Sequence, residues 1–155
     1  MESALSEGAN FAITLSIQSR LDQVRLVRAA LFGVLDHLGV VESDIYSLQL
    51  AVTEIVNNCF EHGYEGAEDR HIEVRIQVCD ADVQIDVIDD APPFPQDQRY
   101  RLLDEPLRME DPDEEWTIRG HGLQIVRQTV DSVELTTRNG QNCITLRKHV
   151  GLQEN

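Results

Sequence analysis

The chain has 155 residues, of which 41% are hydrophobic and 26% charged, a composition typical of a soluble globular domain. Thirteen Lys and Arg residues against 28 Asp and Glu give a net charge of −15, so most of the surface should repel nucleic acid and anionic lipid. We therefore expect neither a direct nucleic-acid partner nor a membrane partner.

The N-terminal residues and the cysteines both indicate a cytoplasmic protein. The opening Met-Glu-Ser-Ala has no basic stretch, and no apolar run approaches the ~18 residues of a membrane span. Cys59, Cys79 and Cys143 are odd in number and far apart, which fits neither a disulfide framework nor a zinc site.

A strand and a helix are expected first. Apolar and polar residues alternate from Phe11 to Ile17, which predicts a half-buried strand. Ser19 together with Asp22 is expected to cap the helix that follows, and Gly39 is expected to end it.

A second helix is predicted from Ser43 or Asp44 to about His62, with Gly63 as its stop. Its apolar positions share one face that should point to the core: Leu48, Val52, Ile55, Val56 and Cys59.

The opposite face of this helix is polar in an unusual way. Glu54, Asn57, Asn58 and Glu61 recur at i, i+3, i+4 and i+7. Each asparagine costs up to ~0.7 kcal/mol in a helix relative to alanine. Carboxylate and amide oxygens one turn apart can hold a hydrated Mg²⁺ or orient a hydroxyl. Taken alone, the same stripe is more typical of a solvated helix face.

A hairpin and a long irregular segment come next. Residues 72–78 and 83–87 alternate on either side of Asp80-Ala81-Asp82, which predicts two paired strands. From residue 90 to 119 the periodicity fails, and all five prolines of the chain lie in this segment. Such a loop is either disordered or a mobile lid over a binding site.

The last third is predicted to form a helix and a second hairpin. The helix spans Gly122 to Val130, and strands at Val133–Thr137 and Cys143–Lys148 flank the turn Asn139-Gly140. Two hairpins instead of βαβ units predict the α+β class. We expect a two-layer α/β sandwich, a mixed and mainly antiparallel sheet with helices on one face.

Two further motifs can carry chemistry. Asp89 ends a strand and is followed by Ala91 and two prolines, so its carboxylate can accept a hydrogen bond from an exocyclic amine. Asp-Asp before Pro-Pro is also ordinary turn chemistry. The turn Arg119-Gly120-His121-Gly122-Leu123 opens a helix, and its backbone N–H groups can cradle an anion, although such glycine turns are common. The chain has neither a Walker-type nor a Rossmann-type glycine loop.

Together the three motifs resemble the Bergerat-type ATP-binding fold of histidine kinases and gyrase, and most closely the stand-alone bacterial anti-sigma-factor serine/threonine kinases. The matching features are Glu54-x-x-x-Asn58, His62-Gly63-Tyr64, Asp89-x-Ala91-Pro-x-Phe94, Gly120-x-Gly122-Leu-x-Ile-Val126 and Ile144-Thr-Leu-Arg-Lys148. The resemblance implies one ATP-binding domain over residues 1–155, with a core of about 11–149 and a mobile lid of about 92–119.

The resemblance also implies ATP and Mg²⁺ as cofactors and assigns a role to individual residues. Asn58 would bind the metal, Glu54 would be the general base, and Asp89 would receive the adenine amine. Gly120 and Gly122 would hold the phosphates. The remaining nucleotide-binding positions are His62, Ala91, Phe94, Arg119, His121 and Leu123.

Three features depart from the family pattern. Ala91 stands where glycine is usual, which should lower nucleotide affinity because the backbone is less free there. Asn57 replaces a commoner threonine. The expected lid is acidic, so its closure over a polyphosphate should depend on Mg²⁺, unless its acids face a partner.

The implied function is partner switching in transcription regulation. The protein would be a homodimer that holds a sigma factor inactive and phosphorylates a small anti-sigma-factor antagonist protein. One alternative is a non-catalytic ATP-binding partner-switch module. Another is a detached histidine-kinase catalytic domain, against which we note that no dimerisation helices with a phosphoacceptor histidine precede the first strand.

Overall fold

The computed structural model describes residues 11–106 and 122–154. In chain order their elements are β1 (Phe11–Gln18), α1 (Leu21–His37), α2 (Glu42–Asn58), the π-helical turn η1 (Cys59–Gly63), β2 (His71–Cys79), β3 (Asp82–Asp89), α3 (Gln96–Leu103), α4 (Gly122–Thr129), β4 (Ser132–Arg138) and β5 (Gln141–His149).

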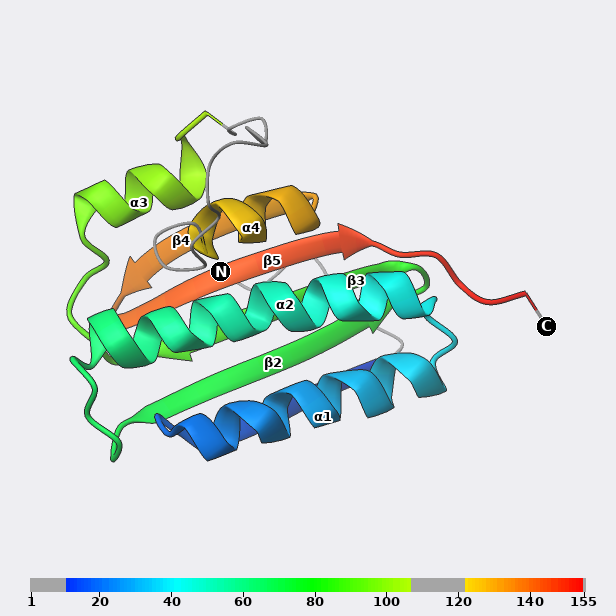
Figure 1. Cartoon of the computed structure of the whole chain (residues 1–155), viewed down its shortest axis with the longest axis horizontal. Coiled ribbons are helices and arrows are strands. Elements are labelled where there is room, and N and C mark those ends of the chain that lie inside the picture. Colours follow the sequence, from blue (N-terminus) through cyan, green and yellow to red (C-terminus); the bar gives the residue numbers. More distant parts are fainter. Residues whose placement is uncertain (1–10, 107–121, 155) are drawn as a thin grey trace, which may run out of the picture.

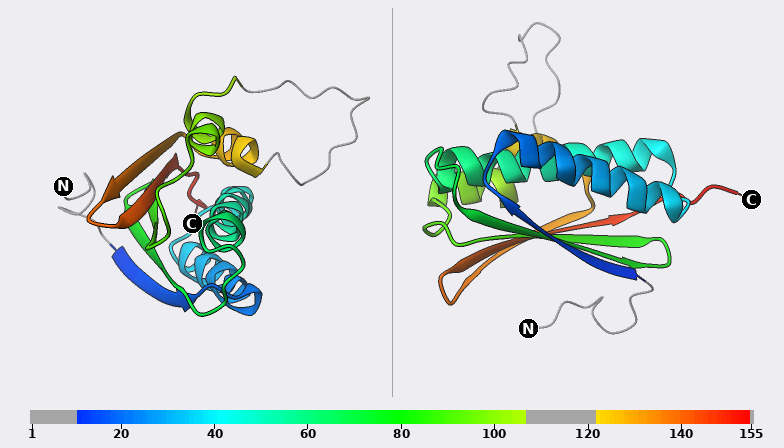
Figure 2. Two further views of the ribbon diagram at one scale, coloured as in Figure 1. Left: turned by 90° about the vertical axis from the view of Figure 1, so that its left-hand side faces the viewer. Right: turned by 90° about the horizontal axis from the view of Figure 1, so that it is seen from below.

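The five strands form one sheet with the order β1-β2-β3-β5-β4, and every neighbouring pair is antiparallel. Helices α1, α2 and α4 lie side by side on one face of this sheet, and α3 packs against α4 and β4 (Figure 1, Figure 2). The expected α+β class and two-layer arrangement are confirmed. The described strands contain no parallel pair, so the sheet is not mixed.

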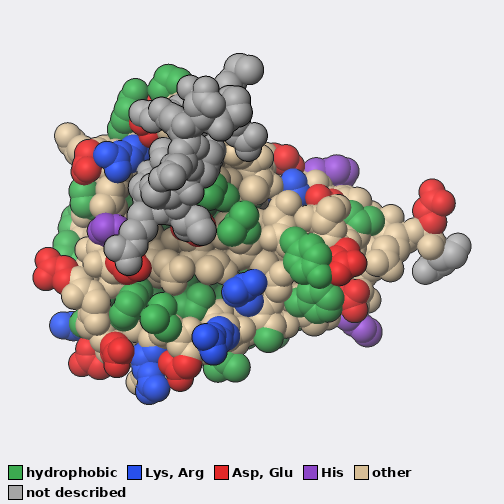
Figure 3. Space-filling model, viewed as in Figure 1, with side chains coloured by type: hydrophobic (Ala, Val, Ile, Leu, Met, Phe, Trp, Pro, Cys, Tyr) green, Lys and Arg blue, Asp and Glu red, His purple; other side chains and the backbone are tan. Residues whose placement is uncertain are grey.

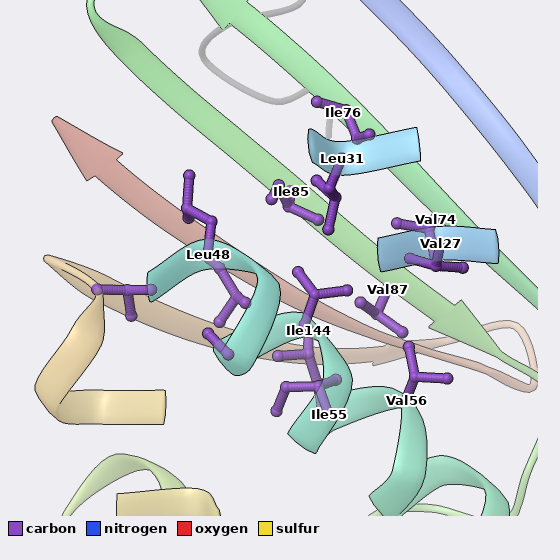
Figure 4. Close-up of a cluster of buried hydrophobic side chains, with 14 of the residues drawn as sticks. Val27, Leu31, Leu48, Ile55, Val56, Val74, Ile76, Ile85, Val87 and Ile144 are labelled. Atoms are coloured by element: carbon purple, nitrogen blue, oxygen red, sulfur yellow. The ribbon is translucent and has the colours of Figure 1, made fainter. Parts of the chain in front are cut away.

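The core lies between the helices and the sheet. Figure 4 shows Leu31 of α1 beside Ile76 and Ile85 of the sheet, and Ile55 of α2 next to Ile144 of β5. All five side chains are buried, and each contributes about 1.5–3 kcal/mol through the hydrophobic effect. Because α2 is anchored by this apolar face, its polar face is held at a fixed position above the sheet.

The start of α1 differs from the expected one. The N-cap residue is Arg20, which makes no side-chain capping hydrogen bond. The Ser19 hydroxyl instead donates to the Ala67 carbonyl and accepts from the Arg70 N–H, and Asp22 pairs with Arg20. The predicted Ser19–Asp22 cap is therefore wrong, because Ser19 ties the end of β1 to the loop before β2.

The second helix changes form at its end. α2 stops at Asn58, and the chain continues as the wide turn η1, in which the Tyr64 N–H donates to the Cys59 carbonyl at 2.8 Å. The predicted α-helical continuation to His62 is wrong in form. The expected i+7 placement of Glu61 no longer applies, because a π-helical turn has a longer period.

Helix α3 lies inside the segment that was expected to be irregular. It has 8 residues, and Leu102 is its one buried residue. Its sequence therefore shows no apolar stripe from which a helix could have been predicted. Packing against α4 holds this helix in place, although its own sequence has no apolar stripe. The rest of that segment, residues 107–121, lies outside the described part of the chain.

Both predicted hairpins are present. Asn139 and Gly140 have φ values of 53° and 76°, as a two-residue turn between twisted strands requires, and Asp80 takes a φ of 52° in the other turn. No helix in the described residues is long and apolar enough to cross a membrane.

Candidate functional site

A cavity of ≈ 210 Å³ lies where η1 meets the ends of β3 and β5, and the segment from Ala91 to α3 forms its other wall. We call it the Asp89 cavity. It is lined by Asn58, Cys59, His62, Gly63, Glu65, Asp89, Ala91, Pro92, Pro93, Phe94, Pro95, Gln98 and Asn142. Apolar walls with a few converging polar groups are typical of a small-molecule site.

Asp89 is the buried acceptor of this cavity. The residue is only 5% exposed. Its Oδ1 accepts from the Ala91 N–H at 2.9 Å and from Asn142 Nδ2 at 2.9 Å, while Oδ2 accepts from the Cys59 thiol at 3.0 Å. A carboxylate offers about four lone-pair sites. One site on Oδ2 therefore remains for a donor that enters the cavity.

The thiol of Cys59 acts as a hydrogen-bond donor. Burial raises the pKa of Cys59 well above its ordinary value, and the negative charge of Asp89 raises it further. The sulfur therefore keeps its proton at neutral pH and donates it to Asp89. The sequence correctly placed Cys59 on the buried face of the helix but gave no hint of this contact.

Asn142 holds the cavity floor together. It lies opposite Asp89 in the register of β5 and β3. Besides Asp89, its Nδ2 contacts the carbonyl oxygens of Ala91 at 3.0 Å and Pro92 at 3.1 Å. One buried amide thus fixes both the carboxylate and the segment that follows β3.

Glu54 and Asn58 lie one helical turn apart on α2, as their spacing predicts. Asn58 is half-buried and lines the Asp89 cavity. Glu54 lies so close to the start of α4 that a Cβ placed on Gly122 would clash with Glu54 Oε2. A glycine at this position lets the helix N-terminus, with its free N–H groups, approach the carboxylate.

The Glu54 carboxyl is also electrostatically unusual. Burial raises the pKa of Glu54 above its ordinary value, and the charge of Glu61 adds to the rise. A carboxylate with a raised pKa is a better proton acceptor, because basicity increases with pKa.

A second close approach joins η1 to the segment after β3. A Cβ on Gly63 would stand 3.0 Å from the Cβ of Ala91. Gly63 does not have a positive φ, so this position needs a small residue and not an unusual backbone conformation. Next to it, the Tyr64 hydroxyl accepts from the Asp90 N–H and donates to the His71 carbonyl. Burial raises the pKa of Tyr64 to about 12, so the hydroxyl keeps its proton.

The structure brings most of the predicted site residues together. Five line the Asp89 cavity, namely Asn58, His62, Asp89, Ala91 and Phe94. Three others lie on α2 and at the start of α4, namely Glu54, Gly122 and Leu123, and Leu123 packs against the core instead of lining the cavity. Arg119, Gly120 and His121 lie outside the described residues.

Of the eight lining residues that were not predicted as site residues, three matter most for the geometry of the site: Cys59, Gln98 and Asn142. Asn142 did carry a signal, because it shares its strand face with Ile144 and Leu146 and is a polar residue at a core-facing position. That its partner is Asp89 becomes clear only from the strand order, which places β5 next to β3. Gln98 lies on the helix that the sequence pattern did not reveal.

The charges around the cavity favour a ligand that brings its own cation. Its lining residues include Glu65 and Asp89 but no Lys or Arg among the described residues. Figure 3 shows Asp and Glu side chains spread around the helix-side face of the molecule. A polyphosphate would need backbone donors, such as those of α4, or a divalent metal.

The oxygen atoms at this site fit a metal ion that is coordinated partly by the protein and partly by a bound small molecule. The described residues contain no cluster of three or more His, Cys, Asp or Glu side chains suited to a metal ion. Mg²⁺ is usually held by one or two protein oxygens, with phosphates and waters completing its shell. The Asn58 amide oxygen, one turn from Glu54, meets that requirement.

The chain is similar to known proteins over most of its length. A family model described as a histidine kinase-like ATPase domain matches residues 17–148. Serine-protein kinase RsbW of Listeria innocua is 26% identical over 132 residues, covering 85% of this chain and 83% of the relative. The protein of the same name from Bacillus pumilus is 28% identical over 130 residues, covering 83% and 80%.

Two solved structures share the fold. The RsbU and RsbW domains of a Mycobacterium tuberculosis protein match with a TM-score of 0.63 and 22% identity, covering 91% of this chain and 33% of that one. In the SiaB–SiaC complex of Pseudomonas aeruginosa, one chain matches with a TM-score of 0.63 and 12% identity, covering 88% of both.

Proposed function

The chain belongs to the histidine kinase-like ATPase domain family, and on this premise we propose that it binds ATP with Mg²⁺ and phosphorylates a serine or threonine of another protein. Residues 1–155 would act as one ATP-binding domain. The observation that carries the proposal is the geometry around Asp89. A buried carboxylate held by three donors retains one free acceptor position facing a cavity with apolar walls.

An adenine base suits the Asp89 cavity. Its exocyclic amine donates to Asp89 Oδ2, while a flat ring can lie between the side chains of η1 and the proline-rich wall. Because Asn142 and Ala91 hold Oδ1, the carboxylate cannot rotate away from this position. The acceptor is therefore preorganised for an amine.

The phosphates would extend from the cavity toward Asn58 and the start of α4. The Asn58 amide oxygen would be a ligand of Mg²⁺, and backbone N–H groups at Gly122 would hold phosphate oxygens. Bound Mg²⁺ neutralises charge that develops on the phosphates during transfer. Neutralisation matters here because the described cavity residues supply no Lys or Arg.

Glu54 would take the proton of the attacking hydroxyl. Its carboxylate lies at the start of α4 and one turn from Asn58, hence between the expected metal and phosphate positions. The serine oxygen attacks the γ-phosphorus, ADP leaves, and the hydroxyl proton passes to a Glu54 carboxylate oxygen. The raised pKa of Glu54 supports this acceptor role.

The relatives named serine-protein kinase RsbW support the choice of a protein hydroxyl as acceptor. We propose that the substrate is a small anti-sigma-factor antagonist, that a sigma factor is the other partner, and that the protein is a cytoplasmic homodimer. Co-purification of untagged partners from the native cell, with and without ATP, tests the partners. Light scattering tests the dimer.

Nucleotide binding is tested by titrating ATP in a calorimeter with Mg²⁺ and then with EDTA. We expect weaker binding in EDTA, and Asn58→Ala should bind as wild type does in EDTA. Asp89→Asn should weaken binding with or without metal, because it replaces one acceptor oxygen by a donor. Normal ATP binding by Asp89→Asn would show that Asp89 is only a turn residue.

Transfer is tested with radiolabelled ATP and the co-purified antagonist. Glu54→Gln keeps the shape of the side chain but removes the basic oxygen. We expect it to bind ATP normally and to transfer phosphate at least ~100-fold more slowly, the lower end of the range for a general base. No transfer by wild type would favour a non-catalytic partner-switch module. Equal transfer rates for wild type and Glu54→Gln would mean that the protein is a kinase but that another group is its general base.

A further inference from the structure

Gln98 presents a buried acceptor that no described residue of the protein uses. Its Oε1 is shielded from solvent and has no hydrogen-bond partner among the described residues, although Gln98 lines the Asp89 cavity. An unsatisfied buried acceptor destabilises the folded state. That destabilisation is removed if a bound ligand donates to this oxygen.

The position of Gln98 on α3 directs its side chain inward. Leu102, one turn later, is fully buried, whereas Asp97, Tyr100 and Arg101 on the same helix are exposed. Residues four apart share a helix face. Gln98 therefore belongs to the buried face of α3, the side on which α3 packs against α4 and β4.

The remainder of this wall has no polar side chain. The lining residues that precede Gln98 on it are Pro92, Pro93, Phe94 and Pro95. The proline residues have no N–H, and the Pro92 carbonyl already accepts from Asn142. Among the described residues of this wall, Gln98 thus supplies the polar side chain.

We infer that Gln98 is a sugar-recognition residue whose Oε1 accepts a hydrogen bond from a ribose hydroxyl of the nucleotide. The inference rests on the proposed ATP site. Outside its phosphates, ATP has three donor groups, the adenine amine and the 2′ and 3′ hydroxyls. The charged Asp89 takes the amine. A nucleotide with its base at Asp89 and its phosphates at Gly122 would place its sugar between the two, in a space that the α3 wall borders because α3 packs against α4 (Figure 1).

The test compares ATP, 2′-deoxy-ATP, 3′-deoxy-ATP and inosine triphosphate, each with Mg²⁺, by calorimetry on the full chain. Wild type should bind ATP about 3–10-fold more tightly than the deoxy analogue that lacks the bonded hydroxyl, the value of one net hydrogen bond. Gln98→Met, an unbranched side chain without an acceptor, should lose this preference. Gln98→Glu retains an acceptor oxygen and should keep it.

The decisive quantity is the ratio of the ATP affinity to the deoxy-ATP affinity within one variant. Any loss of folded protein or added charge affects all these triphosphates alike. Gln96→Met, at an exposed position of the same helix, serves as the control and should leave the preference unchanged. A wild-type protein without a preference, or a Gln98→Met variant that retains it, would overturn the inference.

Three further outcomes separate this inference from the proposed function. If Gln98→Met changes the preference for ATP over inosine triphosphate instead, Gln98 serves the base and the sugar assignment is wrong. If wild type binds no nucleotide at all, the ATP site itself fails and the sugar contact fails with it. If ATP binds and Asp89→Asn weakens it while the sugar preference does not depend on Gln98, only the inference falls.

Discussion

At the scale of single residues, Asn142 contributes more to the site than its neighbours in sequence suggest. Its amide serves Asp89, Ala91 and Pro92 at once. We expect Asn142→Leu, which has the same branching but no donor, to lower the free energy of unfolding by about 1–3 kcal/mol, because it leaves buried acceptors unsatisfied. ATP affinity should fall about tenfold, the equivalent of roughly 1.4 kcal/mol. Urea denaturation and calorimetry measure the two effects.

Gln141→Leu is the matched control for Asn142. Gln141 is the preceding residue of β5 and is exposed, and within the described part of the chain its side chain bonds only to the Asp90 side chain. Gln141→Leu should change neither the free energy of unfolding nor the ATP affinity appreciably. If Asn142→Leu behaves like Gln141→Leu, the amide is not what positions Asp89.

The raised pKa of Glu54 makes stability depend on pH in a defined direction. The folded state raises this pKa above its ordinary value, so the protonated carboxyl is favoured by folding and the ionised one is not. The contribution is therefore present below the ordinary pKa and is lost as pH rises through the folded pKa. At neutral pH the ionised Glu54 is unfavourable, and Glu54→Gln should raise the Tm.

The comparison is made by thermal unfolding of the nucleotide-free protein from pH 7.5 down to pH 4.5. The Tm advantage of Glu54→Gln should shrink as the pH falls. Glu61→Gln, which removes the second cause of the shift, should give a smaller gain of the same sign. A lower Tm for Glu54→Gln at neutral pH would show that the ionised carboxylate is stabilised where it lies.

At the scale of elements, the contact between η1 and the segment after β3 sets the width of the cavity. Gly63 and Ala91 are already close, with 3.0 Å between an added Cβ and the existing one. We expect Gly63→Ala to push the two segments apart, weakening both stability and ATP binding. Ala91→Gly removes the obstructing methyl group and should restore much of the loss.

A double-mutant cycle gives this coupling directly. Contacting residues typically show interaction free energies of about 0.5–3 kcal/mol. The matched control is Gly33→Ala, because a Cβ at Gly33 meets no atom within 4 Å. Additive effects of Gly63→Ala and Ala91→Gly would mean that the two segments do not limit each other.

The elements that the sequence predicted well are those whose own residues repeat at a clear period. The apolar faces of β2 and α2 and the turn Asn139-Gly140 are read directly from the residues. What could not be predicted depends on contacts between distant segments. Ser19 leaves its capping position for Ala67, α3 is held by packing around one buried leucine, and Asn142 finds Asp89 through the strand order.

The candidate site divides in the same way. Glu54, Asn58 and Asp89 were recognisable because their spacing matches a known family. Cys59 and Gln98 were not, because one looks like a core residue and the other lies on a helix without an apolar stripe. Sequence patterns reveal residues that are chemically conspicuous, whereas the residues that hold them in place become visible only in the packed structure.

At the scale of the whole molecule, the net charge of −15 should govern how the nucleotide arrives. The Asp89 cavity has no Lys or Arg among its described lining residues, so metal-free ATP approaches a site of like charge. Salt screens such repulsion, since the Debye length falls from about 30 Å at 0.01 M to about 10 Å at 0.1 M ionic strength. We expect the association rate constant of a fluorescent ATP analogue in EDTA to rise several-fold over this range.

With Mg²⁺ the rise should be smaller, because the metal removes part of the charge of the nucleotide. Stopped-flow fluorescence measures both series, and calorimetry at the same salt concentrations separates the association rate from affinity. The opposite dependence, an association rate that falls with added salt, would mean that basic residues steer the nucleotide despite the overall charge. Arg119 is the first candidate for that role, and Arg119→Gln would then abolish the fall.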